Sequence, residues 1–171
     1  DRGRVLEQAV RLHDAHRAVL THRRMRRDVE RVAQLMRHDD RADPFEVTEL
    51  DDLLVDQLIA HGVQHVFCVP GESYLAALDA FHDRKVTITV CRQEGGAAMM
   101  AEAVGKSTGR PGICFVTRGP GATNAITGIA TAYMDSIPMV VLSGQVQSHL
   151  IGEDAFQETD VINTTIPVTK W

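Results

Sequence analysis

From residue 48 onward, short apolar runs rich in β-branched residues alternate with longer stretches of helical periodicity. The short runs predict four strands, and the stretches between them predict helices, with one more helix leading in. The predicted strands are 63–69, 86–91, 112–117 and 137–142, and the predicted helices are 50–60, 74–82, 97–107 and 122–133. Nearly continuous apolar strands joined by helical crossovers are typical of a parallel sheet covered on both faces. The pattern predicts an α/β fold, a doubly wound and mainly parallel sheet with helices on both faces.

The first 46 residues follow a different pattern, a helical periodicity that changes phase once and predicts one interrupted helix or a helical pair. Residues 1–47 hold 11 of the 18 basic side chains, all of them arginines, and 9 of the 23 acidic ones, whereas the remainder is strongly acidic. This change predicts an arginine-rich helical extension over 1–46 and a separate domain over 47–171. A basic face on an amphipathic helix is usually solvated, so we do not expect a nucleic-acid partner.

Composition and chain ends narrow the class of protein. Hydrophobic residues make up 44% and charged residues 24% of the chain, values typical of a globular protein. No apolar run reaches the length that a membrane helix needs, so the expected location is cytoplasmic, without membrane contact. Because the chain opens without Met and stops just after a strand-like stretch at 166–169, we expect a fragment that is truncated at its C-terminus.

The three cysteines, Cys68, Cys91 and Cys114, each lie in an apolar run, 23 residues apart. An odd number at such spacing favours buried, reduced thiols over a disulfide framework or a zinc site. The sequence therefore predicts no metal site in this chain.

The candidate chemistry lies in the turns after the predicted strands, because ligands of open α/β sheets bind outside the carboxyl ends of the strands. Each of these turns contains glycine, and the second also carries Glu94, followed by two glycines and a helix of small apolar residues. With few polar neighbours, a carboxyl group at this place would hold a proton near neutral pH. Alternatively, Glu94 is an ordinary helix-start carboxylate that backbone amides satisfy. The residues alone do not decide between the two.

The same turns carry a resemblance to a known family. The ordered motifs are Pro70-Gly71, Glu94 before a small-residue helix, Gly119-Pro120-Gly121-Ala122-Thr123-Asn124, the run 127–145, and Asp154-Ala155-Phe156-Gln157-Glu158. In these motifs residues 48–171 resemble the N-terminal, pyrimidine-binding domain of thiamine-diphosphate-dependent enzymes, of the acetolactate synthase large-subunit type.

The resemblance implies a role for each matching residue. Glu94 corresponds to the catalytic glutamate that hydrogen-bonds the pyrimidine ring of thiamine diphosphate and so activates the cofactor. Phe156 corresponds to a residue near the substrate. The residues that correspond to cofactor contacts are Pro70, Gly71, Glu94, Pro120, Asn124 and Gln157.

Three positions depart from the commonest pattern of that family. Glu72 replaces a second glycine after Pro70-Gly71, Gln93 replaces the histidine before the glutamate, and Arg118 stands where serine is usual. The resemblance therefore implies cofactor binding but leaves the identity of the substrate open.

The implied enzyme decarboxylates a 2-keto acid such as pyruvate and transfers the two-carbon unit to a second 2-keto acid, a step of branched-chain amino acid biosynthesis. The diphosphate and Mg²⁺ of the cofactor would be held by a second domain, whose Gly-Asp-Gly or Gly-Asp-Ser triplet does not occur in this sequence. The resemblance places that domain in the same or a neighbouring chain, in a homodimer or tetramer, and leaves a requirement for FAD open. The alternatives are another thiamine-diphosphate decarboxylase or lyase, a naturally split enzyme, and a non-catalytic α/β binding module.

Overall fold

The computed structural model describes residue 27 and residues 44–170. The predicted helical extension over 1–46 lies almost wholly outside this range, so the extension and its boundary remain predictions. In the described part, four strands form one sheet in the order β2-β1-β3-β4, and every neighbouring pair is parallel. The strands are β1 (His65–Cys68), β2 (Thr87–Val90), β3 (Gly112–Val116) and β4 (Met139–Ser143).

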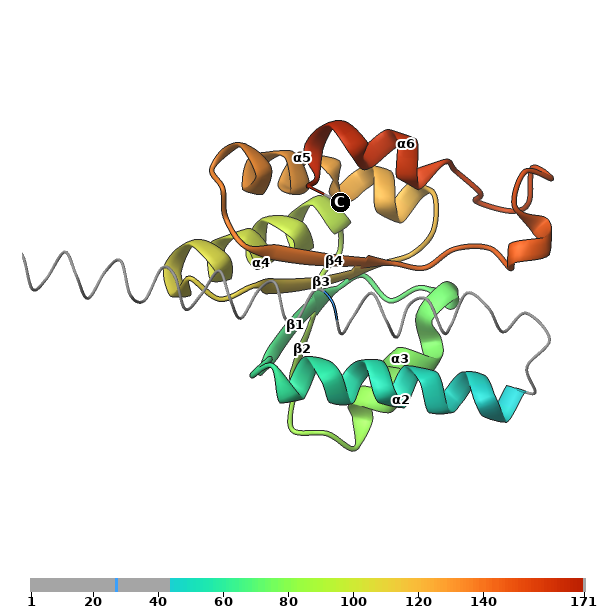
Figure 1. The fold of residues 1–171 in the computed structure, drawn as a ribbon, viewed down its shortest axis with the longest axis horizontal. Coiled ribbons are helices and arrows are strands. Elements are labelled where there is room, and N and C mark those ends of the chain that lie inside the picture. Colours follow the sequence, from blue (N-terminus) through green and yellow to red (C-terminus); the bar gives the residue numbers. More distant parts are fainter. Residues whose placement is uncertain (1–26, 28–43, 171) are drawn as a thin grey trace, which may run out of the picture.

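Helices cover the sheet on both faces, as Figure 1 shows with α2 and α3 on one side and α4, α5 and α6 on the other. They are α2 (Pro44–Ala60), α3 (Leu75–His82), α4 (Glu94–Thr108), α5 (Pro120–Met134) and α6 (Val161–Thr165). Side chains of β3 alternate between the faces: Ile113 and Phe115 pack towards α2 and α3, and Cys114 and Val116 towards α4 and α5. The predicted doubly wound α/β fold is confirmed.

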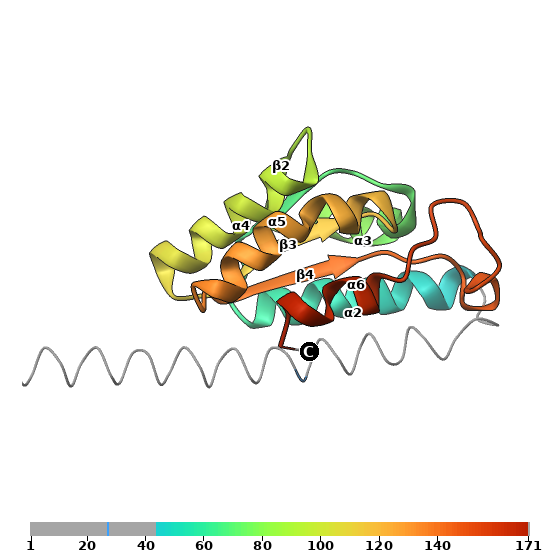
Figure 2. The same cartoon turned by 90° about the horizontal axis from the view of Figure 1, so that it is seen from above.

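The two faces are packed with side chains of different size. Large residues fill the side of α2 and α3, among them the fully buried Val55, Leu58 and Phe81. The side of α4 and α5 is lined mainly by alanines, and a Cβ added at Gly128 of α5 would lie 2.5 Å from the Ala98 Cβ of α4. The small residues let α4 and α5 run side by side at close range over the sheet (Figure 2).

One strand prediction is wrong. The stretch 166–169 does not extend the sheet: Ile166–Val168 is a 3-10 helix that continues directly from α6. Asp160 starts that helical segment by accepting a hydrogen bond from the Asn163 amide at 3.0 Å. Pro167 has no amide hydrogen for a strand ladder, and helical backbone tolerates it in the first turn. The β-branched composition of this stretch was therefore a misleading signal.

The described residues include all three cysteines and the helices from residue 44 onward. Cys68, Cys91 and Cys114 are all free; Cys68 and Cys114 are buried as predicted, whereas Cys91 is only half-buried at the end of β2. Among the helices of residues 44–170, none combines the length and apolar character that spanning a bilayer requires.

Candidate functional site

The strand order creates a topological switch point between β1 and β3, at the carboxyl ends of the strands. From β1 the chain crosses to β2 on one side, and from β3 it crosses to β4 on the other, so the connections leaving β1 and β3 diverge. Ligands of open α/β sheets bind in the crevice at this point, outside the carboxyl ends of the strands. The two turns that flank it are 69–72 after β1 and 117–119 after β3.

Short polar contacts hold these two turns together. The hydroxyl groups of Ser73 and Thr117 are 3.0 Å apart, and the Arg118 amide donates to the Ser73 hydroxyl at 3.3 Å. A Cβ added at Gly71 would lie 2.5 Å from the Cβ of Thr117, so only glycine allows this approach. Gly71 is a predicted site residue, and the structure places it in the turn after β1, where that turn approaches the turn after β3.

Glu94 lies beside this point as the first residue of α4, three residues before the predicted start of that helix. Its carboxylate is buried, with the residue 9% exposed, and its Oε2 accepts a hydrogen bond from Asn124 Nδ2 of α5 at 2.9 Å. The helix-start amide of Gly96 is satisfied by Gln93 Oε1 at 2.9 Å. Gln93 thus does the capping that was the alternative role of Glu94, and two predicted site residues from different helices are in direct contact.

The loop that follows β4 returns to the same edge and brings Gln157 with it. Gly119 has φ +39°, and a Cβ there would lie 2.0 Å from the backbone oxygen of Gln157. Gln157 itself has φ +61°, a left-handed conformation that is uncommon for a side chain of this kind. Glu158 folds the loop by accepting hydrogen bonds from the amides of Gly152 and Ala155. The family motif around residue 157 therefore includes a loop-shaping carboxylate.

The remaining predicted residues lie on the rim of the site. Pro70 is exposed in the turn after β1, and Pro120 is exposed as the first residue of α5, where its missing amide hydrogen has no helical partner to lose. Phe156 is 72% exposed, and the Arg118 guanidinium carbon lies 5.9 Å from its ring centroid. None of these three side chains is buried with Glu94, so their predicted roles stay predictions.

The structure also shows an ion pair that the sequence did not predict. Arg118 Nη2 lies 3.3 Å from Glu72 Oε2, across the two turns of the switch point. In the sequence both residues stand out only as departures from the family pattern. Their opposite charges after two predicted strands are the sequence signal of the pair, and the strand order then makes the two turns neighbours.

Other ionisable groups beneath these turns stay neutral. Burial raises the pKa of Tyr74, whose hydroxyl donates a hydrogen bond to the Val69 carbonyl, and burial raises the pKa of Cys114 to about 12. Burial also raises the pKa of Cys68. These thiols are protonated at neutral pH and are poor nucleophiles.

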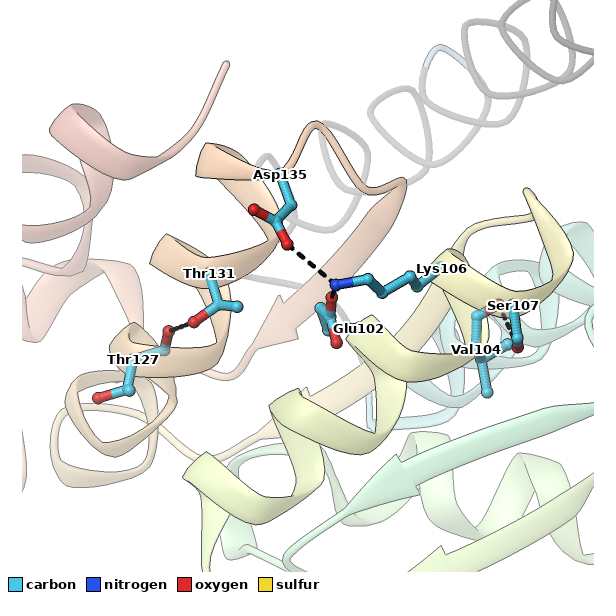
Figure 3. Close-up of polar contacts among 7 residues, drawn as sticks. All are labelled: Glu102, Val104, Lys106, Ser107, Thr127, Thr131 and Asp135. Carbon is cyan, nitrogen blue, oxygen red and sulfur yellow. Dashed lines mark hydrogen bonds and ion pairs between the residues drawn. The ribbon is translucent and has the colours of Figure 1, made fainter.

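The charged residues at the C-terminal end of α4 form ion pairs with each other and with the end of α5. Lys106 lies between Asp135 Oδ2 at 3.0 Å and Glu102 Oε1 at 3.7 Å, and so ties the end of α4 to the end of α5 (Figure 3). The hydrogen bond to Asp135 raises the pKa of Lys106 above its ordinary value. The chain thus places one buried carboxylate at the switch point, Glu94, and another, Glu102, two helical turns away on the same helix.

Comparison with known proteins identifies the family of the matched region. Residues 48–164 match the family described as thiamine pyrophosphate enzyme, N-terminal TPP binding domain. The acetolactate synthase large subunit of Buchnera aphidicola subsp. Acyrthosiphon pisum (strain APS) is 51% identical over 127 residues, which cover 74% of this chain and 22% of that protein.

Two Escherichia coli (strain K12) proteins give similar values. The large subunit of acetolactate synthase isozyme 3 is 52% identical over 120 residues, 70% of this chain and 21% of its own length. The isozyme 2 large subunit is 48% identical over 117 residues, which cover 68% of this chain and 21% of that protein. The chain thus spans about a fifth of the length of these relatives. By its matched region it belongs to the family of N-terminal TPP-binding domains of thiamine pyrophosphate enzymes.

Proposed function

We propose that this chain supplies the pyrimidine-binding half of the active site in an enzyme of the acetolactate synthase type. That enzyme decarboxylates a 2-keto acid such as pyruvate and transfers the two-carbon unit to a second 2-keto acid. The observation that carries the proposal is the buried Glu94 carboxylate, held by Asn124 at 2.9 Å beside the switch point of the sheet. A buried carboxyl group fixed in one orientation, at the edge where such sheets bind ligands, is the arrangement that proton transfer to a bound ring requires.

The residues around Glu94 fit a pyrimidine ring. Asn124 engages Oε2, and within residues 44–170 no side chain or amide is hydrogen-bonded to Oε1. Oε1 lies against Gly121, where an added Cβ would be 3.4 Å away. The second oxygen therefore remains available to a ring nitrogen, and glycine at 121 leaves space beside it. When bound, thiamine diphosphate supplies the carbanion chemistry that amino acid side chains lack.

The protein's own contribution is orientation and proton transfer. Asn124 donates to one carboxyl oxygen and so fixes the direction in which the other points. Gln93 accepts the hydrogen bond of the Gly96 amide, so capping of α4 does not engage the Glu94 carboxyl group. Gly119 and the left-handed Gln157 bring the loop after β4 against the start of α5. In this proposal Glu94 is the catalytic residue, and Pro70, Gly71, Pro120, Asn124 and Gln157 line the cofactor.

The other half of the site is proposed to come from a second domain, in the same or a neighbouring chain of a dimer or tetramer. Most of the cofactor's charge lies on its diphosphate, which in proteins is usually bound together with Mg²⁺ held by carboxylate and amide oxygens. The turns after β1, β2 and β3 offer glycines, two glutamates and two arginines, and the residues that the structure describes contain no cluster of side chains that could hold a metal ion. Mg²⁺ is therefore assigned no ligand in this chain, and a requirement for FAD stays open.

A second candidate is a different thiamine-diphosphate decarboxylase or lyase on the same scaffold. The Arg118–Glu72 ion pair favours it, because charged residues stand at the switch point where the common synthase pattern has glycine and serine. Product analysis with pyruvate as the sole substrate separates the candidates: acetolactate identifies the synthase, and acetaldehyde identifies a decarboxylase.

The proposal is tested by Glu94→Gln in the complete enzyme. Loss of a proton-transfer group typically lowers a rate by about 10²- to 10⁴-fold, so we expect pyruvate turnover to fall by that factor. Hydrogen–deuterium exchange at the reactive carbon of the bound cofactor should slow in parallel.

Glu102→Gln is the matched control, because it makes the same change at a buried carboxylate of the same helix, two helical turns from Glu94. Its turnover should stay within about twofold of the parent. Equal losses in both variants, or an unchanged exchange rate in Glu94→Gln, would contradict the assignment.

A further inference from the structure

The Glu72–Arg118 ion pair joins two turns that are 46 positions apart in sequence and adjacent in space. Each residue follows a strand that forms one side of the switch point, β1 or β3. Side chains at the ends of these strands face the crevice in which ligands of such sheets bind. The pair therefore stands at the ligand edge and not on a remote surface.

The two partners of the pair are unequally buried. The side chain of Arg118 is only 13% exposed, whereas that of Glu72 is 76% exposed. Arg118 Nε is buried and has no hydrogen-bond partner, and within residues 44–170 Glu72 is the acceptor that the guanidinium reaches. An arginine carries five N–H donors, so a single contact at 3.3 Å leaves its charge incompletely compensated.

The surroundings fix the position of the guanidinium group. The backbone amide of Arg118 is held by Ser73, and the exposed Phe156 ring lies 5.9 Å from the guanidinium carbon. The neighbouring Thr117 lies next to Gly121, where an added Cβ would be 2.7 Å from Thr117 Cγ2 and 3.4 Å from Glu94 Oε1. Arg118 is thus anchored at its backbone, contacts an aromatic ring, and is linked through two packed residues to the proposed catalytic carboxyl group.

We propose that Arg118 binds the carboxylate of the substrate and that Glu72 occupies the guanidinium in the absence of substrate. This assignment rests on the proposed function, since a 2-keto acid carries the carboxylate that is bound. A planar guanidinium matches a carboxylate through two parallel hydrogen bonds, an arrangement stronger than the single contact with Glu72. Glu72 is largely solvated and makes a single contact at 3.3 Å, so a ligand that forms two parallel hydrogen bonds displaces it. The pair thereby selects acidic over neutral carbonyl compounds.

The experiment compares oxamate, an unreactive isostere of pyruvate, with oxamide, its neutral counterpart. Both are titrated into the complete enzyme loaded with thiamine diphosphate and Mg²⁺, and the KM for pyruvate is measured on the same samples. In Arg118→Met we expect the Kd of oxamate and the KM of pyruvate to rise by roughly tenfold or more, with little change for oxamide. Arg118→Lys, which keeps the charge but not the planar fork, should lie between Arg118→Met and the parent.

Glu72→Gln provides an independent arm that leaves the buried arginine in place. Removing the competing carboxylate should lower the Kd of oxamate and the KM of pyruvate several-fold. Arg110→Met is the matched control, because Arg110 is an exposed arginine at the opposite end of β3 and should leave every value unchanged. Thermal melts identify any variant that has not folded, and the Glu72→Gln arm does not depend on replacing a buried group.

Failure of the Arg118 assignment and failure of the proposed function give different results. If oxamate and oxamide respond equally to Arg118→Met, or if Glu72→Gln leaves oxamate binding unchanged, Arg118 is a structural arginine and the assignment is overturned. The same conclusion follows if the parent enzyme turns over pyruvate but does not bind oxamate. If the parent binds oxamate in an Arg118-dependent manner but consumes no 2-keto acid, the anion site stands and the proposed function fails.

Discussion

Helices cover both faces of the sheet, but the side chains packed on the two faces differ in size. Beside α2 and α3 the core contains the large side chains of Val55, Leu58 and Phe81, whereas beside α4 and α5 it is built mainly from alanine. Burial of large apolar groups stabilises a fold most strongly, so the first face carries more stabilisation per residue. The second face uses small residues that bring two helices close together. The close approach of α4 and α5 is what joins Glu94 to Asn124.

This difference predicts how mutations on each face should behave. Changes on the side of α2 and α3 should alter the free energy of unfolding and leave the proposed site intact. Changes on the side of α4 and α5 should alter stability and cofactor binding together, because the helix spacing serves both. All variants are to be measured in the complete protein.

The largest effect on stability is expected for Leu58→Ala. Leu58 is fully buried, and such a truncation typically lowers the free energy of unfolding by about 2–5 kcal/mol. Denaturant titration measures this loss, while the kcat of the folded enzyme should stay near that of the parent. Ile59→Ala, at the exposed neighbouring position, is the control and should lose far less. A comparable loss at both positions would show that this face does not carry the core.

A smaller loss of stability, accompanied by a functional defect, is expected for Gly128→Val. Even a single Cβ at position 128 would lie 2.5 Å from the Ala98 Cβ, so α4 and α5 must separate to admit the valine side chain. Overpacking of this kind typically costs about 1–3 kcal/mol. Calorimetric titration should show weaker thiamine diphosphate binding, since Glu94 and Asn124 lie on the separated helices. Gly96→Ala is the stability control, because a Cβ at Gly96 meets nothing within 4 Å; destabilisation by both variants would contradict the packing argument.

Asn124→Ala tests the contact that the close approach produces. Without its donor, the buried Glu94 carboxylate keeps an unsatisfied oxygen, a loss worth about 1–2 kcal/mol. We expect this to appear as a roughly five- to thirtyfold decrease in turnover or cofactor affinity. Asn163→Ala removes an exposed side-chain contact on α6 and should change neither quantity. Cofactor affinity and turnover that both match the parent would remove Asn124 from the site.

The sequence predicted the sheet well because its four strands are short apolar runs between helical stretches. It predicted the start of α4 three residues too late, since Gln93 is not among the commonest capping residues, yet it starts the helix by accepting from Gly96. It also predicted a strand at 166–169, because β-branched composition reports a preference for strands and not the presence of a pairing partner.

The candidate site was predicted residue by residue from motifs, but its geometry was not. The motifs named Glu94 and Asn124, 30 positions apart, without indicating that they share a hydrogen bond. The Glu72–Arg118 pair and the capping role of Gln93 are tertiary and local contacts of residues that stand out in the sequence only as departures from the family pattern. The Glu72–Arg118 contact depends on which turns the strand order makes neighbours, and one-dimensional periodicity does not contain that order.

The smallest effect is expected at Asp51, a buried carboxylate on the opposite face from Glu94 that has no place in the proposed chemistry. Burial, with a lesser contribution from the neighbouring Asp52, raises the pKa of Asp51 from 3.8 to about 6. The folded state therefore binds this proton more tightly than the unfolded state, so stability falls as the pH rises from about 4 to about 6 and the loss persists above that range. Asp51→Asn removes the buried charge and should raise the free energy of unfolding by about 1 kcal/mol at pH 7.5, because the carboxylate is only partly removed from water. The gain should disappear near pH 4, which a series of denaturant titrations across pH would show.

Asp56→Asn is the control of opposite sign: Arg84 donates a hydrogen bond to Asp56 at 2.7 Å and lowers its pKa, so this variant should be less stable at pH 7.5 and match the parent only in acid. If Asp51→Asn were instead destabilising at pH 7.5, the Asp51 carboxylate would have a stabilising partner, as Glu94 has in Asn124.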